Sequence, residues 1–434
     1  MKLDGLGTLV RQFRRQARLT QYELAEISTV SVRAIRDLEN GRVERPRQET
    51  VRLIANGLHL GESQRLVLHA ACGGNPEDAV ARLIGDAAPI APPARAIRLS
   101  GREVETQAVV RSMTHDLNRW ITVTGLHGVG KTELALDVAH TLYQLHACSV
   151  LWVACDDSLP PTDAPSRFGV DSAVVAKVSR IGEQLLGNDF DAHQLCQMIG
   201  QRRTLLVLDG CDLRLIRSER MMALLSECRG LRLLLTTRDS AAMPAKHLLP
   251  LEPLALPERN GDDGKGREEH FAAVQLMLSY IRRLRPGTVQ QSAVKELADV
   301  CRALDCIPGA LKLAAEWALL LSPAQLLERA TRDPLSLLVS PTEGPSERDF
   351  RPVLAHAVRE LSAADRRVLR DLCLSRTSWT VQDVSMIIGG TEGDSARAVY
   401  GLYLRGLVRR THASVGSRFR VLNLVMHTVA EAEG

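Results

Sequence analysis

The pattern of apolar and polar positions divides the chain into a helical start, an alternating middle and a helical end. Residues 1–72 have the spacing of short helices, and residues 73–98 are rich in Gly, Ala and Pro, which is typical of a linker. From Ile121 onward, short apolar runs alternate with helical stretches, which is the pattern of a parallel α/β domain. The apolar runs predict strands at Ile121–Gly125, Ser149–Cys155, Thr204–Asp209 and Arg232–Thr237, with a fifth candidate at His247–Leu254.

Two polar stretches divide the rest of the chain. The first runs from Pro257 to Glu269 and precedes a helical segment, in which Ser322 is expected to cap a helix together with Gln325. The second runs from Ser340 to Asp349, and after it helical stretches are followed by two short strands, which indicates a winged helix. The sequence therefore predicts a multidomain fold, with an all-α domain at 1–72, a linker at 73–98, an α/β domain at 99–257, a helical domain at 258–340 and a winged-helix domain at 341–434.

A helix–turn–helix pattern lies in the first domain. Thr20 to Glu23 reads Thr-Gln-Tyr-Glu, a capping box that starts a helix with Leu24, Ala25 and Ile27 expected on its inner face. After a turn, a second helix is expected from Ser31, with Ile35 and Leu38 packing inward and Gly41 ending it. Over about residues 5–70 the segment resembles the repressor-type (Cro/cI, XRE-like) helix-turn-helix family.

The resemblance implies binding to double-stranded DNA, with the second helix in the major groove. The residues that it places at base edges are Gln21, Ser31, Val32, Arg33 and Asp37, and those that it places at phosphates are Arg42 and Arg47. Charge agrees with this interpretation, because residues 1–52 hold 11 Lys and Arg against 7 Asp and Glu, which equals the excess of +4 in the whole chain. The alternative is a small helical domain that docks on proteins.

A phosphate-binding loop follows the first predicted strand. Gly125 to Thr132 reads G-L-H-G-V-G-K-T, which matches the P-loop motif between an apolar strand and a helix expected from Leu134 to Leu145. Backbone N–H groups at Gly125, Gly128 and Gly130 are suited to phosphate oxygens. Lys131 is expected to reach the β- and γ-phosphates of a nucleotide, and Thr132 is expected to hold Mg²⁺.

Three further polar residues are predicted near the phosphates. Asp209 ends an apolar strand in the manner of a Walker B carboxylate and is expected to support Mg²⁺. Gly210 stands where many active ATPases have a second acid, and the next acid is Asp212, so we expect slow hydrolysis or none. Arg238 ends the strand at Leu233–Thr237 and is expected to sense the γ-phosphate.

Together these segments resemble a STAND-class NTPase with an NB-ARC domain, over about residues 99–430. The other segments that carry the resemblance are Ser100 to Glu103, Thr236 to Arg238, and Cys306 to Leu311. It implies that Arg102 and Pro308 line the adenine pocket, although Cys306 replaces the Gly that usually comes two residues before this Pro. The family's Met-His-Asp motif corresponds to Val421-Leu422-Asn423, which lacks the His, and His427 lies one helical turn later.

The resemblance implies an ADP/ATP switch that assembles into homo-oligomers on activation, with a separate protein as one source of its signal. The leading hypothesis is a nucleotide-gated DNA-binding transcriptional regulator, in which Mg²⁺ accompanies the adenine nucleotide. The first alternative is a signalling or defence scaffold that oligomerises on ATP binding and uses its N-terminal helices for docking. The second is a working ATPase, against which Gly210 argues.

Composition adds three expectations. Nine Cys are scattered without zinc-ligand spacing, so we interpret them as small buried hydrophobes. No run of 18 apolar residues occurs, so no membrane span or membrane partner is expected. The first 20 residues lack the apolar core of a secretory signal, which favours the cytoplasm.

Overall fold

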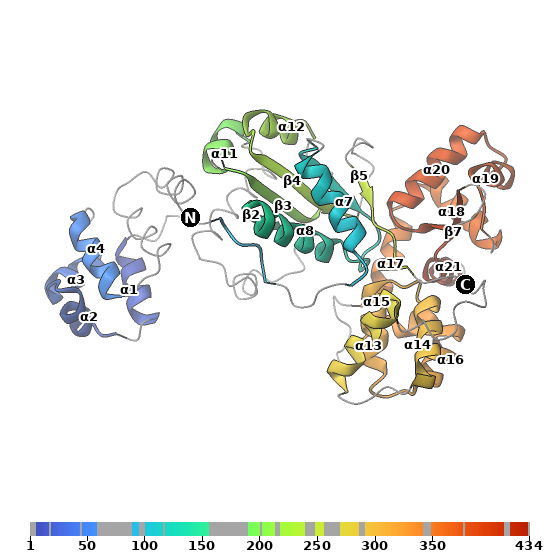
Figure 1. The fold of residues 1–434 in the computed structure, drawn as a ribbon, viewed down its shortest axis with the longest axis horizontal. Helices are drawn as coiled ribbons and strands as arrows, with labels where there is room; N and C mark the ends of the chain where they lie inside the picture. Colours follow the sequence, from blue (N-terminus) through green and yellow to red (C-terminus); the bar gives the residue numbers. More distant parts are fainter. Residues whose placement is uncertain are drawn as a thin grey trace.

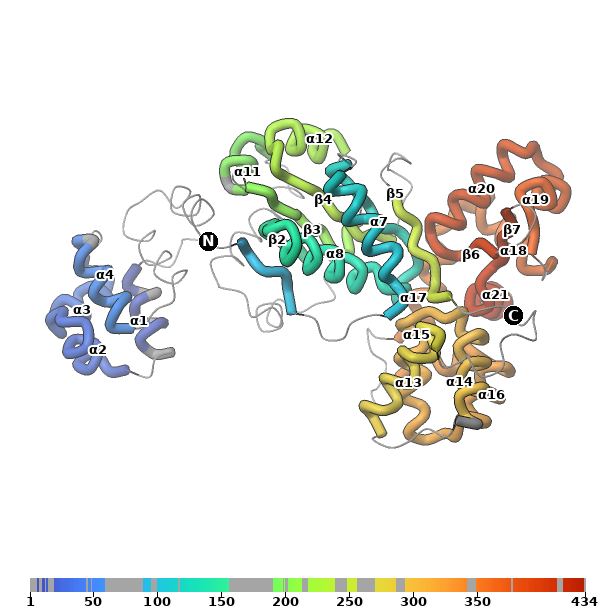
Figure 2. The backbone as a smooth tube through the Cα atoms, viewed as in Figure 1, coloured from blue at the N-terminus to red at the C-terminus, as the bar shows by residue number. Residues whose placement is uncertain are grey.

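The structure is a computed structural model of the 434-residue chain, shown as a ribbon in Figure 1 and as a backbone tube in Figure 2. It describes residues 6–16, 19–43, 46–58, 89–94, 100–115, 118–155, 190–199, 202–212, 218–238, 248–255, 270–285, 291–341, 349–375, 378–411 and 417–432.

The described part of the N-terminal domain is helical throughout. Its elements are α1 (Leu6–Gln16), α2 (Gln21–Ser28), α3 (Val32–Glu39) and α4 (Gln48–Gly57). The capping box at Thr20 and Glu23 is confirmed, and Gly41 follows α3 with a φ of +70°. Leu24, Ile35 and Leu38 are buried as predicted.

The predicted place of Ile27 on the inner face of α2 is wrong. Its side chain is 48% exposed, and Ser28 occupies the buried position instead. Ser28 can lie there because its hydroxyl donates to the carbonyl of Leu24, so that no polar group is left without a partner. Gly57 of α4 packs directly on Ser28, where an added Cβ would come within 2.8 Å of the Ser28 Cβ.

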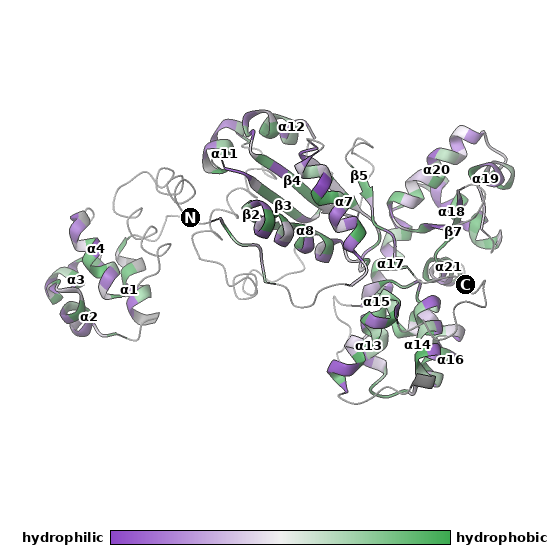
Figure 3. Ribbon diagram, in the orientation of Figure 1, coloured by the Kyte–Doolittle hydropathy of each residue, from purple (hydrophilic) through white to green (hydrophobic). Residues whose placement is uncertain are grey.

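A parallel sheet forms the centre of the α/β domain, as the sequence predicted. Its strands are β1 (Trp120–Thr124), β2 (Ser149–Ala154), β3 (Thr204–Cys211), β4 (Leu231–Thr237) and β5 (Leu248–Pro250), in the order β2-β3-β4-β1-β5. The middle strands are almost entirely apolar because both of their faces are covered, whereas the helices show mixed colours in Figure 3.

Helices cover both faces of this sheet. One face packs against α7 (Glu103–Thr114) and α8 (Lys131–His146), and the other against α11 (Ala192–Ile199) and α12 (Ser218–Glu227). Helix α8 begins three residues before the predicted Leu134, directly after the N-cap Gly130. The phosphate-binding loop therefore leads straight into the first turn of α8.

Part of the segment expected as a linker lies against the sheet. The backbone N–H of Val150 donates to the carbonyl of Ile90 at 2.9 Å, and the carbonyl of Pro93 lies 2.9 Å from the ring of His140. Residues 89–94 therefore cover the edge of β2, which would otherwise offer unpaired backbone groups.

The helical segment that follows packs into one core with the C-terminal segment. It contains α13 (Ala272–Leu284), α14 (Gln291–Ala303), α15 (Pro308–Trp317), α16 (Pro323–Arg332) and a short 3₁₀ helix, η4 (Pro334–Leu337). The predicted capping box of Ser322 and Gln325 is present at the start of α16. Their shared core includes Leu126 of the phosphate-binding loop and Leu254 of the α/β domain, and it extends to Val429 near the C-terminus.

The C-terminal segment consists of helices, two short strands and a last helix, and its assignment as a winged helix stays a prediction. It contains α17 (Phe350–Arg359), α18 (Ala363–Ser375), α19 (Val381–Ile388), α20 (Glu392–Leu404), the antiparallel pair β6 (Val408–Thr411) and β7 (Arg418–Val421), and α21 (Asn423–Glu431). Trp379 pairs with Phe419 of β7 through two backbone hydrogen bonds. Among all the described helices, none combines the length and the apolar character that a membrane crossing requires.

Candidate functional site

The loop between β1 and α8 has the backbone of a phosphate cradle. Gly125, Gly128 and Gly130 have φ values of +137°, +71° and +103°, which favour glycine. A Cβ on Gly125 would also lie 2.7 Å from the carbonyl oxygen of Leu251. The sequence thus places glycine where the turn requires it. The N-terminus of the 16-residue helix α8 adds positive potential at the end of the loop.

Lys131 is folded back onto this loop. Its Nζ donates to the carbonyl oxygens of Gly125 at 2.8 Å and Leu126 at 2.9 Å. Burial and, to a smaller extent, the nearby charge of Arg238 lower the pKa of Lys131 to about 7, and the charge of Asp209 opposes them. An anion in the loop would offset the cost of burying this ammonium group.

Thr132, Asp209 and Thr236 meet at the carboxyl ends of β3 and β4. The hydroxyls of Thr132 and Thr236 donate to the same oxygen of Asp209, at 2.9 and 2.5 Å. Thr236 also accepts from the backbone N–H of Gly210 at 2.8 Å. The hydroxyl and carboxylate oxygens of Thr132 and Asp209 are the hard ligands that Mg²⁺ prefers, so these residues fit that ion.

The other two predicted catalytic residues lie at exposed strand ends. Arg238 directly follows β4 and is close enough to Lys131 to affect its pKa. Asp212 directly follows β3 and is exposed. The structure thus brings Lys131, Asp209 and Arg238 to one edge of the sheet, and Asp212 lies three residues beyond Asp209 on the same strand end.

Arg102 bonds both to the phosphate-binding loop and to the segment that follows β5. Its guanidinium is buried and donates to the carbonyls of Val129 at 3.0 Å and Glu252 at 2.6 Å, and it pairs with Glu105 at 2.8 Å. Burial lowers the pKa of Arg102, and the charge of Glu105 opposes this. These contacts position the loop relative to α7, the buried Nε of Arg102 has no hydrogen-bond partner in this structure, and the place of Arg102 in an adenine pocket stays a prediction.

The start of α15 touches the phosphate-binding loop directly. Pro308 is buried at the first position of α15, and the N–H of Gly309 donates to the carbonyl of Gly128 at 2.9 Å. Cys306 stands where the family usually has Gly, and it adopts the left-handed backbone that favours glycine, with a φ of +57°. The backbone turn is therefore made without glycine.

Phe350 and Gly406, both from the C-terminal segment, also pack against the phosphate-binding loop. A Cβ on Gly128 would lie 2.5 Å from the ring of Phe350, and a Cβ on Gly406 would lie 2.5 Å from the N–H nitrogen of Leu126. Gly406 also has a φ of +72°. The loop is thus packed against α15, α17 and the turn before β6.

The stretch that replaces the family's Met-His-Asp motif contacts the helical segment. The amide of Asn423 donates to the carbonyl of Ala303 at 2.7 Å, and the buried carboxylate of Asp305 accepts from the N–H of Leu424 at 2.9 Å. His427 is half-buried one turn later on α21. Asn423 therefore links α21 to the end of α14 in this structure.

Helix α3 presents a polar outer face. Arg33 has a side chain that is 93% exposed, and Asp37 lies 3.9 Å from Arg33 and 3.3 Å from Arg42. The hydroxyl of Ser31 caps the helix by accepting from the N–H of Ala34, and Val32 is half-buried. Arg42 and Arg47 are exposed on either side of the two residues that the structure leaves undescribed between α3 and α4.

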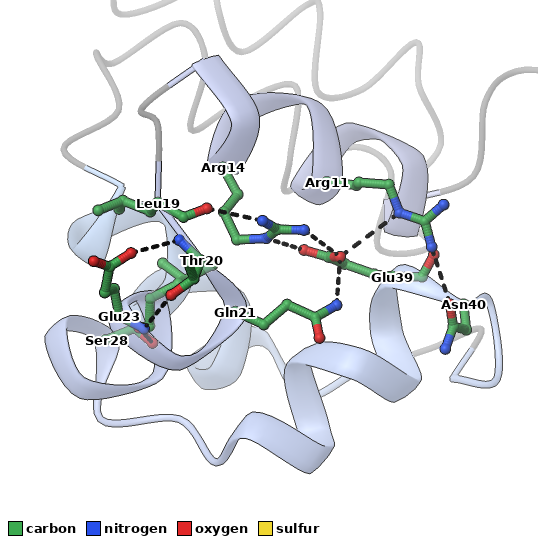
Figure 4. A network of polar contacts seen from close by, with 10 residues as sticks. Arg11, Arg14, Leu19, Thr20, Gln21, Glu23, Ser28, Glu39 and Asn40 are labelled. Atoms are coloured by element: carbon green, nitrogen blue, oxygen red, sulfur yellow. Dashed lines mark hydrogen bonds and ion pairs between the residues drawn. The ribbon is translucent and has the colours of Figure 1, made fainter.

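Gln21 belongs to a network centred on Glu39 (Figure 4). The side chain of Glu39 is fully buried, and it accepts from Arg14 at 2.6 and 2.8 Å and from Gln21 at 2.8 Å. Burial alone would raise the pKa of Glu39, but the hydrogen bonds from Arg14 and Gln21 and the charges of Arg14 and Arg11 hold it below its ordinary value of 4.5. In this structure Gln21 helps to hold α2 against α3.

Sequence reasoning missed the roles of Thr236 and Glu39. Thr236 was part of a recognised motif, but its bond to Asp209 depends on the neighbouring position of β3 and β4 in the sheet. Glu39 was not singled out in the sequence, and its burial depends on the distant Arg14. A glutamate directly before a helix-ending Asn-Gly, with arginines in a preceding helix, was the one signal available.

Relatives with curated names cover most of this chain. A Mycobacterium tuberculosis protein named "Putative HTH-type transcriptional regulator Rv0890c" is 25% identical over 324 residues, which are 73% of this chain and 34% of the relative. The chain thus spans about a third of the length of that relative. Another M. tuberculosis protein, named "Uncharacterized protein Rv0894", is 26% identical over 69% of this chain and 68% of its own length.

Solved structures with P-loop cores are similar at low identity. The Walker-type ATPase PABY2304 of Pyrococcus abyssi aligns with 78% of this chain and 98% of its own, with a TM-score of 0.45 and 14% identity. A signal transduction ATPase with numerous domains (STAND) and a tetratricopeptide repeat sensor, PH0952 of Pyrococcus horikoshii, covers 79% of this chain and 44% of its own, with a TM-score of 0.30 and 16% identity.

Family models match both candidate sites. Residues 6–68 match the helix-turn-helix domain, and they include α2, α3 and the Glu39 network. Residues 102–247 match the NB-ARC domain, and they include the phosphate-binding loop, Asp209 and Arg238. The chain therefore combines an N-terminal helix-turn-helix domain with an NB-ARC domain.

Proposed function

We propose that this chain is a DNA-binding transcriptional regulator whose state depends on the adenine nucleotide held at its P-loop. Two features present in one chain carry the proposal. One is the exposed Arg33 on α3, and the other is the phosphate-binding loop, to which Lys131 bonds, next to the bonded pair Thr132 and Asp209. The name of the M. tuberculosis relative points in the same direction.

The DNA-binding role falls on the outer face of α3. Arg33 is free of the domain core and has the donor geometry for the O6 and N7 atoms of a guanine. Ser31 caps the same helix, Val32 and Asp37 lie on it, and Gln21 is the first residue of α2. Arg42 and Arg47 take the phosphates, because both are exposed and cationic.

The nucleotide role falls on the edge of the sheet where β1 and β3 end. The glycines at 125, 128 and 130 receive the phosphates, Lys131 supplies a charge, and Thr132 with Asp209 holds Mg²⁺. Arg238 senses the γ-phosphate. Arg102, which bonds to the loop, and Pro308, which starts α15, line the adenine pocket. The bound Mg²⁺ supplies charge that neutralises the phosphate oxygens.

Slow turnover belongs to the same proposal. Gly210 follows Asp209, and its backbone N–H donates to the hydroxyl of Thr236. The next acid, Asp212, is exposed beyond the end of β3. A general base at the attacking water is therefore not provided by the residue that follows Asp209. A nucleotide would persist long enough to define a state, as a switch requires.

The packing around the loop supports the coupling of nucleotide to conformation. Gly128 touches Gly309 and Phe350, and Gly406 touches Leu126. Helices α15 and α17 and the turn before β6 therefore pack against the loop that would hold the phosphates. A ligand that binds this loop more tightly in one arrangement of these segments will shift their equilibrium.

Selection of DNA sites by the purified full chain tests the proposal. The selection is run with ADP and with a non-hydrolysable ATP analogue, each with Mg²⁺. We expect one enriched sequence whose affinity differs between the two nucleotides and falls steeply with salt. Enrichment of a sequence with equal affinity in both states would contradict the gating, and no enriched sequence in either state would contradict the DNA-binding role.

Replacing Arg33 with Ala is expected to weaken binding to the selected site by about 1–3 kcal/mol, roughly 5- to 150-fold, and to relax the base preference at one position. Fluorescence anisotropy with the selected duplex and its single-base variants measures both effects. Arg33→Lys keeps the charge but not the bidentate geometry, so it should relax the preference as well. Arg52→Ala on α4 is the control, and an equal loss with that variant would remove the special role of Arg33.

A scaffold function is the second candidate, and the exposed apolar residues of α2 favour it. Tyr22 is 65% exposed and Ile27 is 48% exposed, so α2 offers a surface for a protein partner. If the site selection fails, oligomerisation of the full chain with the ATP analogue but not with ADP is the result that this function requires.

A further inference from the structure

Two cysteines face each other beside the predicted Mg²⁺ ligand Asp209. Cys155 directly follows β2, and Cys211 is the last residue of the neighbouring strand β3. Their sulfur atoms are 3.1 Å apart, and the backbone N–H of Cys155 donates to the carbonyl of Asp209 at 2.8 Å. The two thiols thus lie on adjacent, hydrogen-bonded strand ends.

An irregularity in β3 brings the sulfurs together. In a regular strand, Cys211 would point to the same face as Asp209, because side chains alternate. The register between β3 and β4 shifts between Leu208 and Cys211, and Gly210 has a φ of +73°. As a result Cys211 packs on the α11–α12 face together with Leu208 and Val153, which is also the face that Cys155 borders.

The pair combines one accessible thiol with one buried thiol. Cys155 is half-buried, whereas only 3% of Cys211 is exposed. A reagent from solution therefore reaches Cys155 first, and Cys211 is positioned to react second.

We propose that Cys155 and Cys211 form a reversible disulfide at this edge of the sheet, by exchange with a low-molecular-weight disulfide. In the first step the Cys155 thiol loses its proton and attacks the reagent, which forms a mixed disulfide and releases one thiol. In the second step the Cys211 thiol loses its proton and attacks the sulfur of Cys155, which closes the protein disulfide and releases the second thiol. Two protein thiols are oxidised and one reagent disulfide is reduced to two thiols.

The strand geometry allows this bond with little movement. Neighbouring strands lie about 4.8 Å apart, which is within the Cα–Cα range of disulfides. A second pair, Cys196 and Cys228, is hydrogen-bonded in the same core cluster, but both residues are buried, with exposures of 7% and 2%. A disulfide in solution has no comparable route to that pair.

The test uses the full chain in buffers with defined ratios of oxidised to reduced glutathione. After acid quenching and alkylation of the remaining thiols, peptide mass mapping locates each disulfide. We expect a cross-linked peptide pair containing Cys155 and Cys211, with a mass lower by two hydrogen atoms, which dithiothreitol converts back to thiols. Circular dichroism before and after oxidation should show the same helix and strand content.

Variants separate the two steps. With Cys211→Ser, the first step should still occur, and glutathione should remain attached to Cys155. With Cys155→Ser, Cys211 should remain a thiol, and with Cys228→Ser the 155–211 cross-link should form as in the unmodified chain. The proposal is overturned if the unmodified chain carries only glutathione on Cys155, if Cys155 pairs with another cysteine, or if neither residue oxidises at any ratio.

Discussion

Replacing Glu39 with Ala is expected to destabilise the helix-turn-helix domain by about 3–5 kcal/mol, which is most of the stability of a small domain. The Glu39 carboxylate is fully buried and neutralises Arg14, whose own side chain is only 12% exposed. Its removal leaves Nε and Nη2 of Arg14 and the amide of Gln21 without this acceptor, while Nη1 of Arg14 keeps its bond to the carbonyl of Leu19, and it removes a contact between α1, α2 and α3. The expected loss of stability is large because hydrogen-bond donors that stay buried without an acceptor cost free energy.

Hydrogen–deuterium exchange of the full chain measures this effect locally. Amides of α1 and α3 should lose protection with Glu39→Ala, whereas amides of β3 and β4 should not change. Glu49→Ala is the matched control, because its pair with Arg52 is 2.7 Å long but both side chains are 61% exposed, so its loss should cost under about 0.5 kcal/mol. Equal protection of α1 and α3 in the two variants would show that the Glu39 network does not stabilise the domain.

The same network sets an acid limit for the domain. The pKa of Glu39 in the folded domain lies below its ordinary value of 4.5, so the unfolded chain binds the proton more readily. The stabilisation by Glu39 is therefore complete above about pH 4.5 and is lost as the pH falls through the lower pKa of the folded domain. In Glu39→Ala this part of the acid dependence should be absent.

Local patterns predicted the elements well. The apolar runs located β1 to β4 to within two residues at either end, and the capping boxes at Thr20 and Ser322 were confirmed. These features depend on neighbours within four residues, so the sequence contains what determines them. Alternating apolar runs and helical stretches were likewise sufficient for a parallel sheet, because both of its faces must be covered.

Features that depend on distant contacts were not predictable. Ile27 has the spacing of an inner residue, yet Ser28 is the residue that lies buried against Gly57 of α4. The bulge at Gly210 moves Cys211 to the other face of β3, against the period of the strand. The burial of Arg102 against the carbonyls of Val129 and Glu252 depends on segments 27 and 150 residues away.

Replacing Lys131 with Ala is expected to weaken the binding of ATP and ADP with Mg²⁺ by about 2–5 kcal/mol, roughly 30-fold to several-thousand-fold. In the structure its ammonium group is buried and bonded to two neutral carbonyls, and its pKa is lowered to about 7. A phosphate group would provide the full opposite charge that the loop itself lacks, so much of the binding energy should depend on this one side chain.

Titration calorimetry with each nucleotide measures the loss, and two variants make it interpretable. Lys131→Met keeps most of the buried apolar length, so it should lose affinity as Lys131→Ala does while preserving the packing of α8. Lys295→Ala on α14 removes the same charge from an exposed position and should bind nucleotide normally. Unchanged affinity in Lys131→Met would mean that nucleotide does not bind at the P-loop. If nucleotide gates DNA binding through this loop, the DNA affinity of Lys131→Met should no longer respond to ADP or to the ATP analogue at concentrations that saturate the unmodified chain.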